Sequence, residues 1–196
     1  MTVLSLSTKQ KYGTLLGPNS AFMPGSYESI ATVSVGSGGT SYAEFTSIPS
    51  TYSHLQIRTL QRDTGTPANM DNLYLQFNGD TGTNYSYHRL IGTGSSVLVT
   101  SDATISNLKI GLQPNAGITA NAFGTSIIDI LDYANTSKYK TVRTLVGSDT
   151  NDTNGNSSLF SGNWRNTNAI TSIKIYPEAN NFAQYSRFAL YGIKVS

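Results

Sequence analysis

Cysteine is absent from this chain of 196 residues. Its absence excludes disulfide bonds, a thiolate nucleophile and a cysteine-ligated zinc site. Stability must therefore come from packing, from backbone hydrogen bonds or from contacts between subunits. The length suits one all-β domain, with room for a separate terminal arm.

Charge is also scarce, because Asp, Glu, Lys and Arg make up only 12% of the residues, against about a quarter in most soluble proteins. Ser, Thr, Asn and Gly are abundant instead, so the surface is neutral and rich in hydroxyl groups. Such surfaces suit durable extracellular or particle-bound proteins. The net charge is +2 and no run of basic residues occurs, so we expect no nucleic-acid partner.

Long apolar runs are missing as well, since no window approaches the roughly 18 apolar residues of a membrane span. The first residues, MTVLSLSTKQKYG, lack the charged start and the cleavage site of a secretory signal. We therefore expect a protein that is made in the cytosol and has no membrane partner. Helix-type apolar spacing with end caps is not found either, so little helix is predicted.

The clearest strand pattern is a hairpin over residues 125–146. In its first arm Ile128 and Ile130 point to one face, whereas Leu131 and Tyr133 point largely to the other. A short polar turn and a second alternating arm follow. A hairpin of this size is not stable alone in water, so the rest of the chain must supply a partner sheet.

Further strands are predicted along most of the chain, and we pair them with their sequence neighbours. Hairpins are predicted to join residues 27–35 to 40–48, 73–78 to 85–90, and 169–177 to 186–195. Single strands are predicted over residues 53–62, 97–99 and 108–112. Roughly eight to eleven short strands with Gly and Asn turns indicate an all-β protein. We predict a jelly-roll-like antiparallel β-sandwich over residues 27–196, preceded by an extended N-terminal arm over residues 1–26.

The arm is unusual because it combines apolar side chains with Gly and Pro residues that interrupt regular structure. Its apolar residues are Leu4, Leu6, Leu15, Leu16, Phe22 and Met23. A solvated tail would leave all of them in water. We therefore expect the arm to dock on another subunit or on a partner surface.

Catalytic chemistry has few candidates. His54 and His88 are the only histidines, and a base–carboxylate pair would need one of them beside Asp129 or Asp132. No G-x-S-x-G nucleophile elbow accompanies them, and an exposed strand face or a subunit contact accounts for His88 better. We predict that the protein is not an enzyme and has no catalytic residues.

A calcium loop is suggested only superficially by the Asp and Asn residues over 149–155. Aligning Gly155 with the required glycine places Thr150 and Ser161 at the first and last ligand positions, where carboxylates are needed. We predict no metal site and no cofactor.

Aromatic residues are the remaining candidates, with twelve tyrosines and one tryptophan. Tyr85, Tyr87 and Trp164 are candidates for stacking on sugars, as in a lectin-like binder. They are equally suited to a subunit interface, where tyrosine buries its ring and keeps its hydroxyl bonded. The sequence leaves both alternatives open.

Four segments carry a resemblance to a known family: VSVGSGGTSYAEFTSIPSTYSHLQIR, LYLQFNGDTGTNYSYHRLIGTGSS, FGTSIIDILDYANTSKYKTVRTLVG and AQYSRFALYGIKV. From about residue 30 to the C-terminus, the chain resembles small virion proteins of tailed bacteriophages, cyanophages among them. The resemblance implies a jelly-roll-like protein on the particle surface, made in the host cytoplasm and often trimeric. It implies either a capsid cement (decoration) protein or a part of a tail fibre.

The function expected from this resemblance is a non-enzymatic capsid cement protein. The expected partners are sibling subunits in a homotrimer and the major capsid protein or other virion proteins. The alternative is a tail-fibre or receptor-binding module that recognises a host surface glycan.

Overall fold

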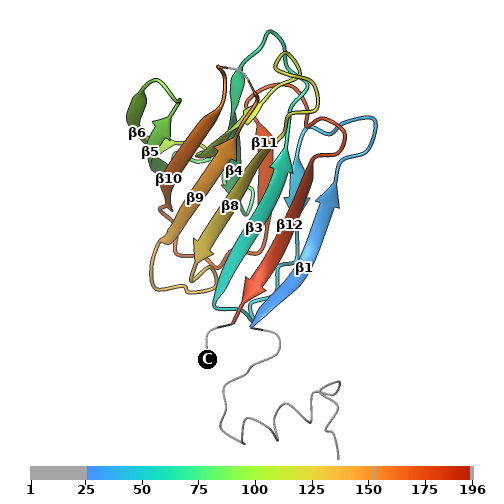
Figure 1. The fold of residues 1–196 in the computed structure, drawn as a ribbon. Coiled ribbons are helices and arrows are strands. Elements are labelled where there is room, and N and C mark those ends of the chain that lie inside the picture. The colour runs from blue at the N-terminus through green and yellow to red at the C-terminus, as the bar shows by residue number, and fades with distance from the viewer. Residues whose placement is uncertain (1–25, 152, 195–196) are drawn as a thin grey trace, which may run out of the picture.

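The computed structural model describes residues 26–151 and 153–194, which fold into twelve strands without any helix (Figure 1). The strands are β1 (Tyr27–Ser34), β2 (Ala43–Phe45), β3 (His54–Gln61), β4 (Met70–Phe77), β5 (Tyr85–Gly92), β6 (Val97–Ile105), β7 (Leu108–Pro114), β8 (Gly124–Leu131), β9 (Lys140–Ser148), β10 (Asn156–Trp164), β11 (Ile173–Pro177) and β12 (Arg187–Ile193). Within this part of the chain no helix has the length and apolar character needed to cross a membrane.

The strands form two sheets, and every pairing is antiparallel. The larger sheet has the order β1-β12-β3-β8-β9-β10-β5-β6, and the smaller has the order β2-β11-β4-β7. If β5, β6, β9 and β10 are set aside, β1-β12-β3-β8 faces β2-β11-β4-β7. Of these eight strands, the first, β1, pairs with the last, β12, and the second, β2, pairs with the last but one, β11. This order is the winding of a jelly roll. The predicted jelly-roll-like antiparallel β-sandwich is confirmed.

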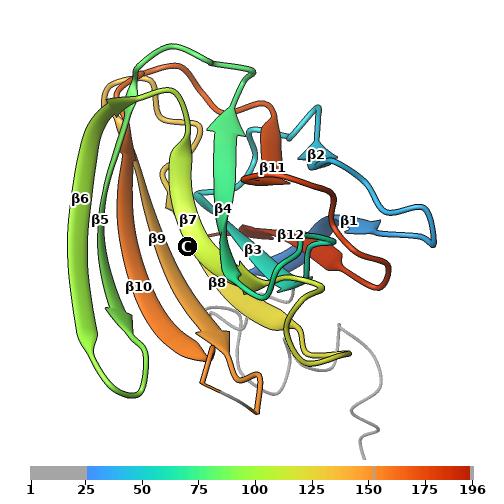
Figure 2. The ribbon, with the colours of Figure 1, turned by 90° about the horizontal axis from the view of Figure 1, so that it is seen from above.

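Two inserted hairpins make the sheets unequal. One hairpin, β5 with β6, lies in the chain between β4 and β7, and the pair β9 and β10 lies between β8 and β11. Both insertions join the same sheet, because β9 pairs with β8, β10 with β9, and β5 with β10. As a result one sheet has eight strands and the other four, and β5 and β6 lie at the far side of the larger sheet from β1 (Figure 2).

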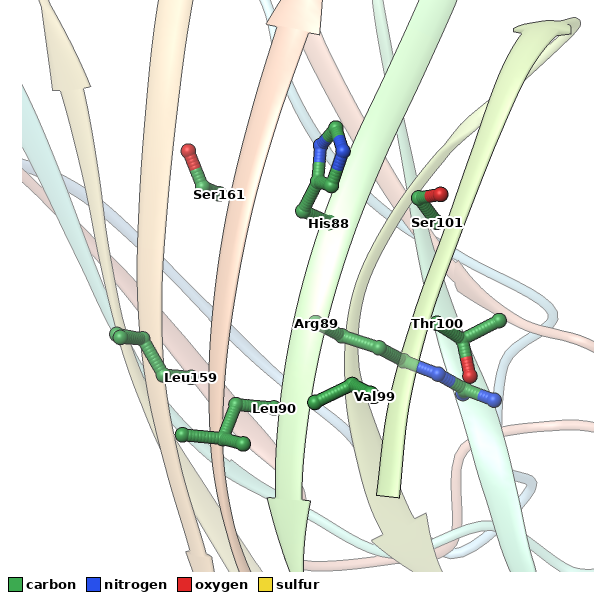
Figure 3. Close-up of a pocket in the computed structure, with 8 residues that line it drawn as sticks. All are labelled: His88, Arg89, Leu90, Val99, Thr100, Ser101, Leu159 and Ser161. Carbon is green, nitrogen blue, oxygen red and sulfur yellow. The ribbon is translucent and has the colours of Figure 1, made fainter.

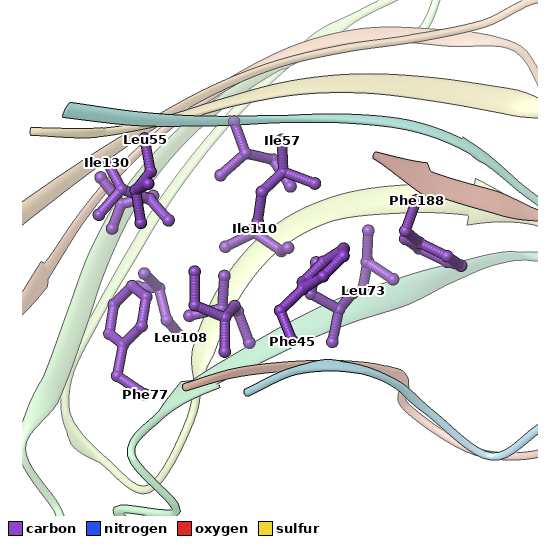
Figure 4. Packing of buried hydrophobic residues seen from close by; sticks show 14 of the residues in the cluster. Phe45, Leu55, Ile57, Leu73, Phe77, Leu108, Ile110, Ile130 and Phe188 are labelled. Carbon is purple, nitrogen blue, oxygen red and sulfur yellow. The ribbon is translucent and has the colours of Figure 1, made fainter. Parts of the chain in front are cut away.

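The core lies between the two sheets and is built by strict alternation of side chains. On β4, Leu73, Leu75 and Phe77 are all fully buried, and on β3 Leu55 and Ile57 are buried in the same way. Side chains from the two sheets interdigitate in this layer (Figure 4).

Strand pairing differs from the prediction in three places. The strands predicted as hairpins over residues 27–35 and 40–48, 73–78 and 85–90, and 169–177 and 186–195 do form, but the two members of each lie in opposite sheets. For example, β4 pairs with β11 and β7, whereas β5 pairs with β10 and β6. In a jelly roll most connections cross from one sheet to the other, so neighbours in the sequence are not neighbours in a sheet.

The hairpin predicted over residues 125–146 is confirmed, because β8 and β9 pair in register. Ile128 and Ile130 face the core and Leu131 is exposed, so they lie on opposite faces as predicted. Tyr133 was predicted to share the face of Leu131, but it is buried. The reason is Asp132, because its φ of 49° lies in the left-handed region. This residue ends the extended strand, so the alternation of faces does not continue to Tyr133.

Candidate interaction surface

The outer face of the larger sheet carries apolar side chains that the core does not use. On β8, β9, β10 and β5, the inward-facing residues are buried and the outward-facing ones are exposed in alternation. Alternation normally places polar residues on the solvent side of such a sheet. Here several outward positions hold leucine, isoleucine or valine instead.

These residues lie in one line across adjacent strands. Val99 of β6 is opposite Leu90 of β5, Leu90 is opposite Leu159 of β10, Leu159 is opposite Leu145 of β9, and Leu145 is opposite Ile127 of β8. We call these five residues the apolar row. Their exposed fractions are 75%, 47%, 45%, 59% and 37% in the same order. With neighbouring strands about 4.8 Å apart, the row is about 19 Å long.

Polar side chains border the apolar row on one side. His88, Ser101 and Ser161 occupy the next outward positions on β5, β6 and β10, and Arg143 and Asp129 continue this border on β9 and β8. Arg143 Nη2 lies 2.9 Å from Asp129 Oδ2, so the charges at this end of the border are paired. The border therefore presents little net charge to a partner.

Small residues border the other side, where the outward positions on β5, β10 and β9 are Gly92, Ser157 and Gly147. The backbone is thus accessible next to the apolar row. Between the row and the polar border, a hollow of about 470 Å³ opens over β5, β6 and β10 (Figure 3). Its lining includes Leu90, Val99 and Leu159 from the row, with His88 beside them.

A continuous line of exposed aliphatic side chains is a feature of interaction surfaces, whereas apolar residues scattered singly are ordinary. The apolar row lies on consecutive hydrogen-bonded strands of one sheet, and the strand registers set the order and spacing of its side chains. Its chemistry supports binding by apolar contact.

Comparisons with known proteins add no relative. No protein-family model matches this chain, and searches of curated proteins and of solved structures give no match either.

Trp164, Tyr85 and Tyr87 do not lie on the surface, so the prediction that they stack on a glycan or line an interface is wrong for this domain. Trp164 is 1% exposed, its ring packs against Phe77 at 5.4 Å between centroids, and its indole nitrogen donates to Asp80 Oδ2 at 2.7 Å. Tyr85 is fully buried and Tyr87 nearly so. These rings belong to the core because they occupy the inward positions of β10 and β5.

Asp80 is positioned by this buried tryptophan and by its own turn. The carboxylate also accepts hydrogen bonds from the backbone nitrogen of Gly82 at 2.8 Å and from Asn84 Nδ2 at 2.9 Å. Burial alone would raise the pKa of the Asp80 carboxyl, but the donors from Trp164, Asn84 and Gly82 lower it below its ordinary value. These hydrogen bonds fix the turn between β4 and β5. They also occupy the Asp80 carboxylate, so its role is structural.

Other tyrosines, none of them a candidate from the sequence, are exposed instead: Tyr185 by 72%, Tyr139 by 54%, Tyr42 by 42% and Tyr27 by 40%. Tyr185 lies in a turn, Tyr42 and Tyr139 lie just before strands, and Tyr27 begins β1. Lys174 Nζ lies 4.4 Å from the centre of the Tyr42 ring, a cation–π contact.

The two histidines are not brought together. His54 lies on β3 and His88 on β5, with β8, β9 and β10 between these strands. His54 Nδ1 accepts the backbone N–H of Asp132 at 3.0 Å and lies 3.3 Å from its carboxylate. This contact fixes the end of the β8–β9 hairpin. His88 is exposed beside the apolar row.

The remaining sequence candidates have simple structural roles. Asp129 accepts hydrogen bonds from Gln56 and Arg143 on the neighbouring strands, and Asp132 is paired with Lys138. Asp149 accepts the backbone N–H of Asn151 at 2.9 Å, as in an Asx turn. Over residues 26–151 and 153–194, no group of three or more His, Asp or Glu side chains is arranged to hold a metal ion.

The arm residues Leu4, Leu6, Leu15, Leu16, Phe22 and Met23 lie outside the described residues. Their predicted contact with a subunit or with the capsid stays a prediction.

Proposed function

We propose that this chain is a non-enzymatic structural protein of a tailed-phage particle, a capsid cement or decoration protein that attaches to the major capsid protein through its apolar row. The observation that carries the proposal is the row itself. Five aliphatic side chains lie in register across β8, β9, β10, β5 and β6 and contribute nothing to the core of their own domain.

Three further features support this role. The domain is a jelly-roll sandwich, as the resemblance to virion proteins implies. Its charged residues are few, so attachment depends little on salt. The row lies on hydrogen-bonded strands instead of loops, which keeps the ordering cost of binding low. Many copies on a lattice, each of them a homotrimer, would add modest contacts into stable attachment.

Binding to capsids that lack the native copy tests the proposal. The variant Leu145→Ser with Leu159→Ser removes two exposed side chains of the row and leaves the buried residues of β9 and β10 intact. Losing the burial of each costs about 1 kcal/mol, so we expect one subunit to bind roughly 30-fold more weakly. Full-affinity binding by this variant would contradict the proposal.

Leu131→Ser is the matched control, because Leu131 is exposed to a similar degree on the same sheet, at 41%, and lies outside the row. Its binding should equal that of the unmodified protein. Copy number in purified particles tests the location: many copies per particle agree with a cement protein, whereas a few copies favour the tail-fibre alternative.

A further inference from the structure

The two sheets have four edge strands, and three of them are protected against further pairing. β2 has only three residues. β7 carries Lys109, ends at Pro114, and shifts register against β4. β1 shifts register between Ser29 and Ala31, and its Glu28 pairs with Lys194 at 2.8 Å. Short length, lysine, proline and bulges are the features by which proteins block pairing at sheet edges.

β6 lacks nearly all of this protection. It is nine residues long, contains no Lys, Arg or Pro, and hydrogen-bonds to β5 on one side only. Its one charged residue, Asp102, and its register shift against β5 both lie toward the end of the strand, away from Val97–Val99. Eight of its nine residues are exposed, since the smaller sheet ends before reaching it (Figure 2). Val97, Leu98 and Val99 are 70%, 49% and 75% exposed. A long, apolar edge of this kind is suited to accept another strand.

We propose that β6 pairs antiparallel with β6 of a second copy of this chain, across a two-fold axis at Val99. A two-fold axis places β6 of one copy opposite β6 of the other, so the residues that face each other across the axis must be compatible. Around Val99 this condition holds. Val97 faces Ser101 of the second copy, Leu98 faces Thr100, and Ser96 faces Asp102, so no like charges are opposed.

The position of the axis follows from the apolar row. Val99 is the last and most exposed residue of the row, and its outward side chain lies at the free edge. Pairing at Val99 brings the rows of the two copies end to end in one continuous apolar line. The same register stops short of Thr104, whose φ of 58° is left-handed and ends the regular extended backbone.

A two-fold contact joins copies of the chain in pairs. If the chains of a homotrimer contact one another through another part of the domain, the β6 pair links one trimer to a second trimer. The two-fold contact requires the backbone edge of β6, whereas capsid attachment requires the whole apolar row, of which Val99 is one end. Leu145→Ser with Leu159→Ser should therefore weaken attachment and leave the two-fold contact in place, whereas Val99→Lys affects both.

Disulfide trapping provides the test, since the full-length chain has no cysteine and one introduced thiol can only bridge two chains. Residues directly opposite in an antiparallel pair have Cα atoms about 4.5–5.5 Å apart, within the range for a disulfide. We expect Val99→Cys to form a covalent dimer under mild oxidation. Leu145→Cys, equally placed on the row but three strands away, should stay uncrosslinked.

Mass in solution provides the second measurement. Light scattering of the unmodified protein should give an even number of chains, and Val99→Lys should halve that number, because two ammonium groups would meet at the axis. A thermal transition unchanged in Val99→Lys would show that the domain is intact.

Three results would overturn the proposal. An odd number of chains in the unmodified protein excludes the two-fold pair. Crosslinking of Leu145→Cys without crosslinking of Val99→Cys shows that the faces stack instead of the edges. A Val99→Cys thiol that neither crosslinks nor reacts with a soluble thiol reagent shows that residues 1–25 of the same chain cover β6.

Discussion

Asp63 is a buried carboxyl group whose replacement by asparagine should stabilise the protein at alkaline pH. It lies two residues after the end of β3 and is fully buried. Its Oδ1 accepts the backbone N–H of Gly65 at 2.6 Å, and its Oδ2 accepts Gln113 Nε2 at 3.3 Å. The pKa of Asp63 is raised to about 7, mainly by burial and also by the nearby Asp71 carboxyl, although the hydrogen bonds from Gly65 and Gln113 act to lower it.

The direction of the pH effect follows from this raised pKa. The folded protein holds a proton on Asp63 up to about pH 7, whereas the unfolded chain releases it near an ordinary pKa of about 3.9. The stability that comes with the proton is complete below the unfolded pKa and is lost as the pH rises through the folded pKa. The difference between the two pKa values corresponds to about 4 kcal/mol, an upper limit because Asp71 shares in the titration.

Asp63→Asn removes the charge and keeps an oxygen that accepts the N–H of Gly65. The introduced amide nitrogen takes the place of Oδ2 opposite Gln113 Nε2. It can donate to Gln113 once that amide turns over and presents Oε1, a buried atom that has no partner. Urea unfolding between pH 5 and pH 8.5 measures the effect. We expect the unmodified protein to lose stability across this range and the variant to lose less, so that the variant is more stable at pH 8.5 by about 1–4 kcal/mol.

The control is Asp102→Asn, which changes an exposed carboxylate on β6. Its pH dependence should match that of the unmodified protein. If Asp63→Asn shows the same slope of stability against pH as the unmodified protein, Asp63 is already ionised in the folded state and the reasoning fails.

Three further substitutions test the packing. Trp164→Ala should cost about 3–5 kcal/mol in thermal unfolding, because it empties a core site and removes a donor to Asp80; an unchanged transition would contradict its burial. Lys140→Met should cost at least about 2 kcal/mol, because the fully buried ammonium group donates to the carbonyl oxygens of Asn135, Lys138 and Thr167. Gly162→Ala should cost about 1–3 kcal/mol by overpacking, since its Cβ would lie 2.4 Å from Leu108 Cδ1; equal stability in urea would show that Leu108 moves freely.

Local alternation predicts which residues face inward on most strands. It succeeds on β3, β4 and β9 because each is a regular extended segment with a uniform face toward the core. It fails at Tyr133, where the left-handed residue before it changes the direction of the chain. The same alternation could have predicted the burial of Trp164 and Tyr85, because each lies an even number of residues from other buried residues on β10 and β5.

Strand partners are a different matter, because a short loop can return to the same sheet or cross to the opposite one. Sequence neighbours pair at β5–β6, β8–β9 and β9–β10, while the connection from β4 to β5 crosses between sheets. The polar turn sequences do not distinguish these outcomes. The apolar row was therefore invisible in the sequence: it exists only through four successive registers across five strands.

The winding of the jelly roll also decides how the domain responds to mechanical load. β1 and β12 are adjacent and antiparallel, and the carbonyl of Ser26 accepts the backbone N–H of Lys194 at 2.9 Å, so the two ends of the described domain emerge side by side (Figure 1). Tension applied between these ends peels β1 from β12 one residue pair at a time. Tension between the same ends and the apolar row is instead distributed over the whole larger sheet. A domain anchored through the row therefore resists forces at its anchored face and yields first where the two ends meet.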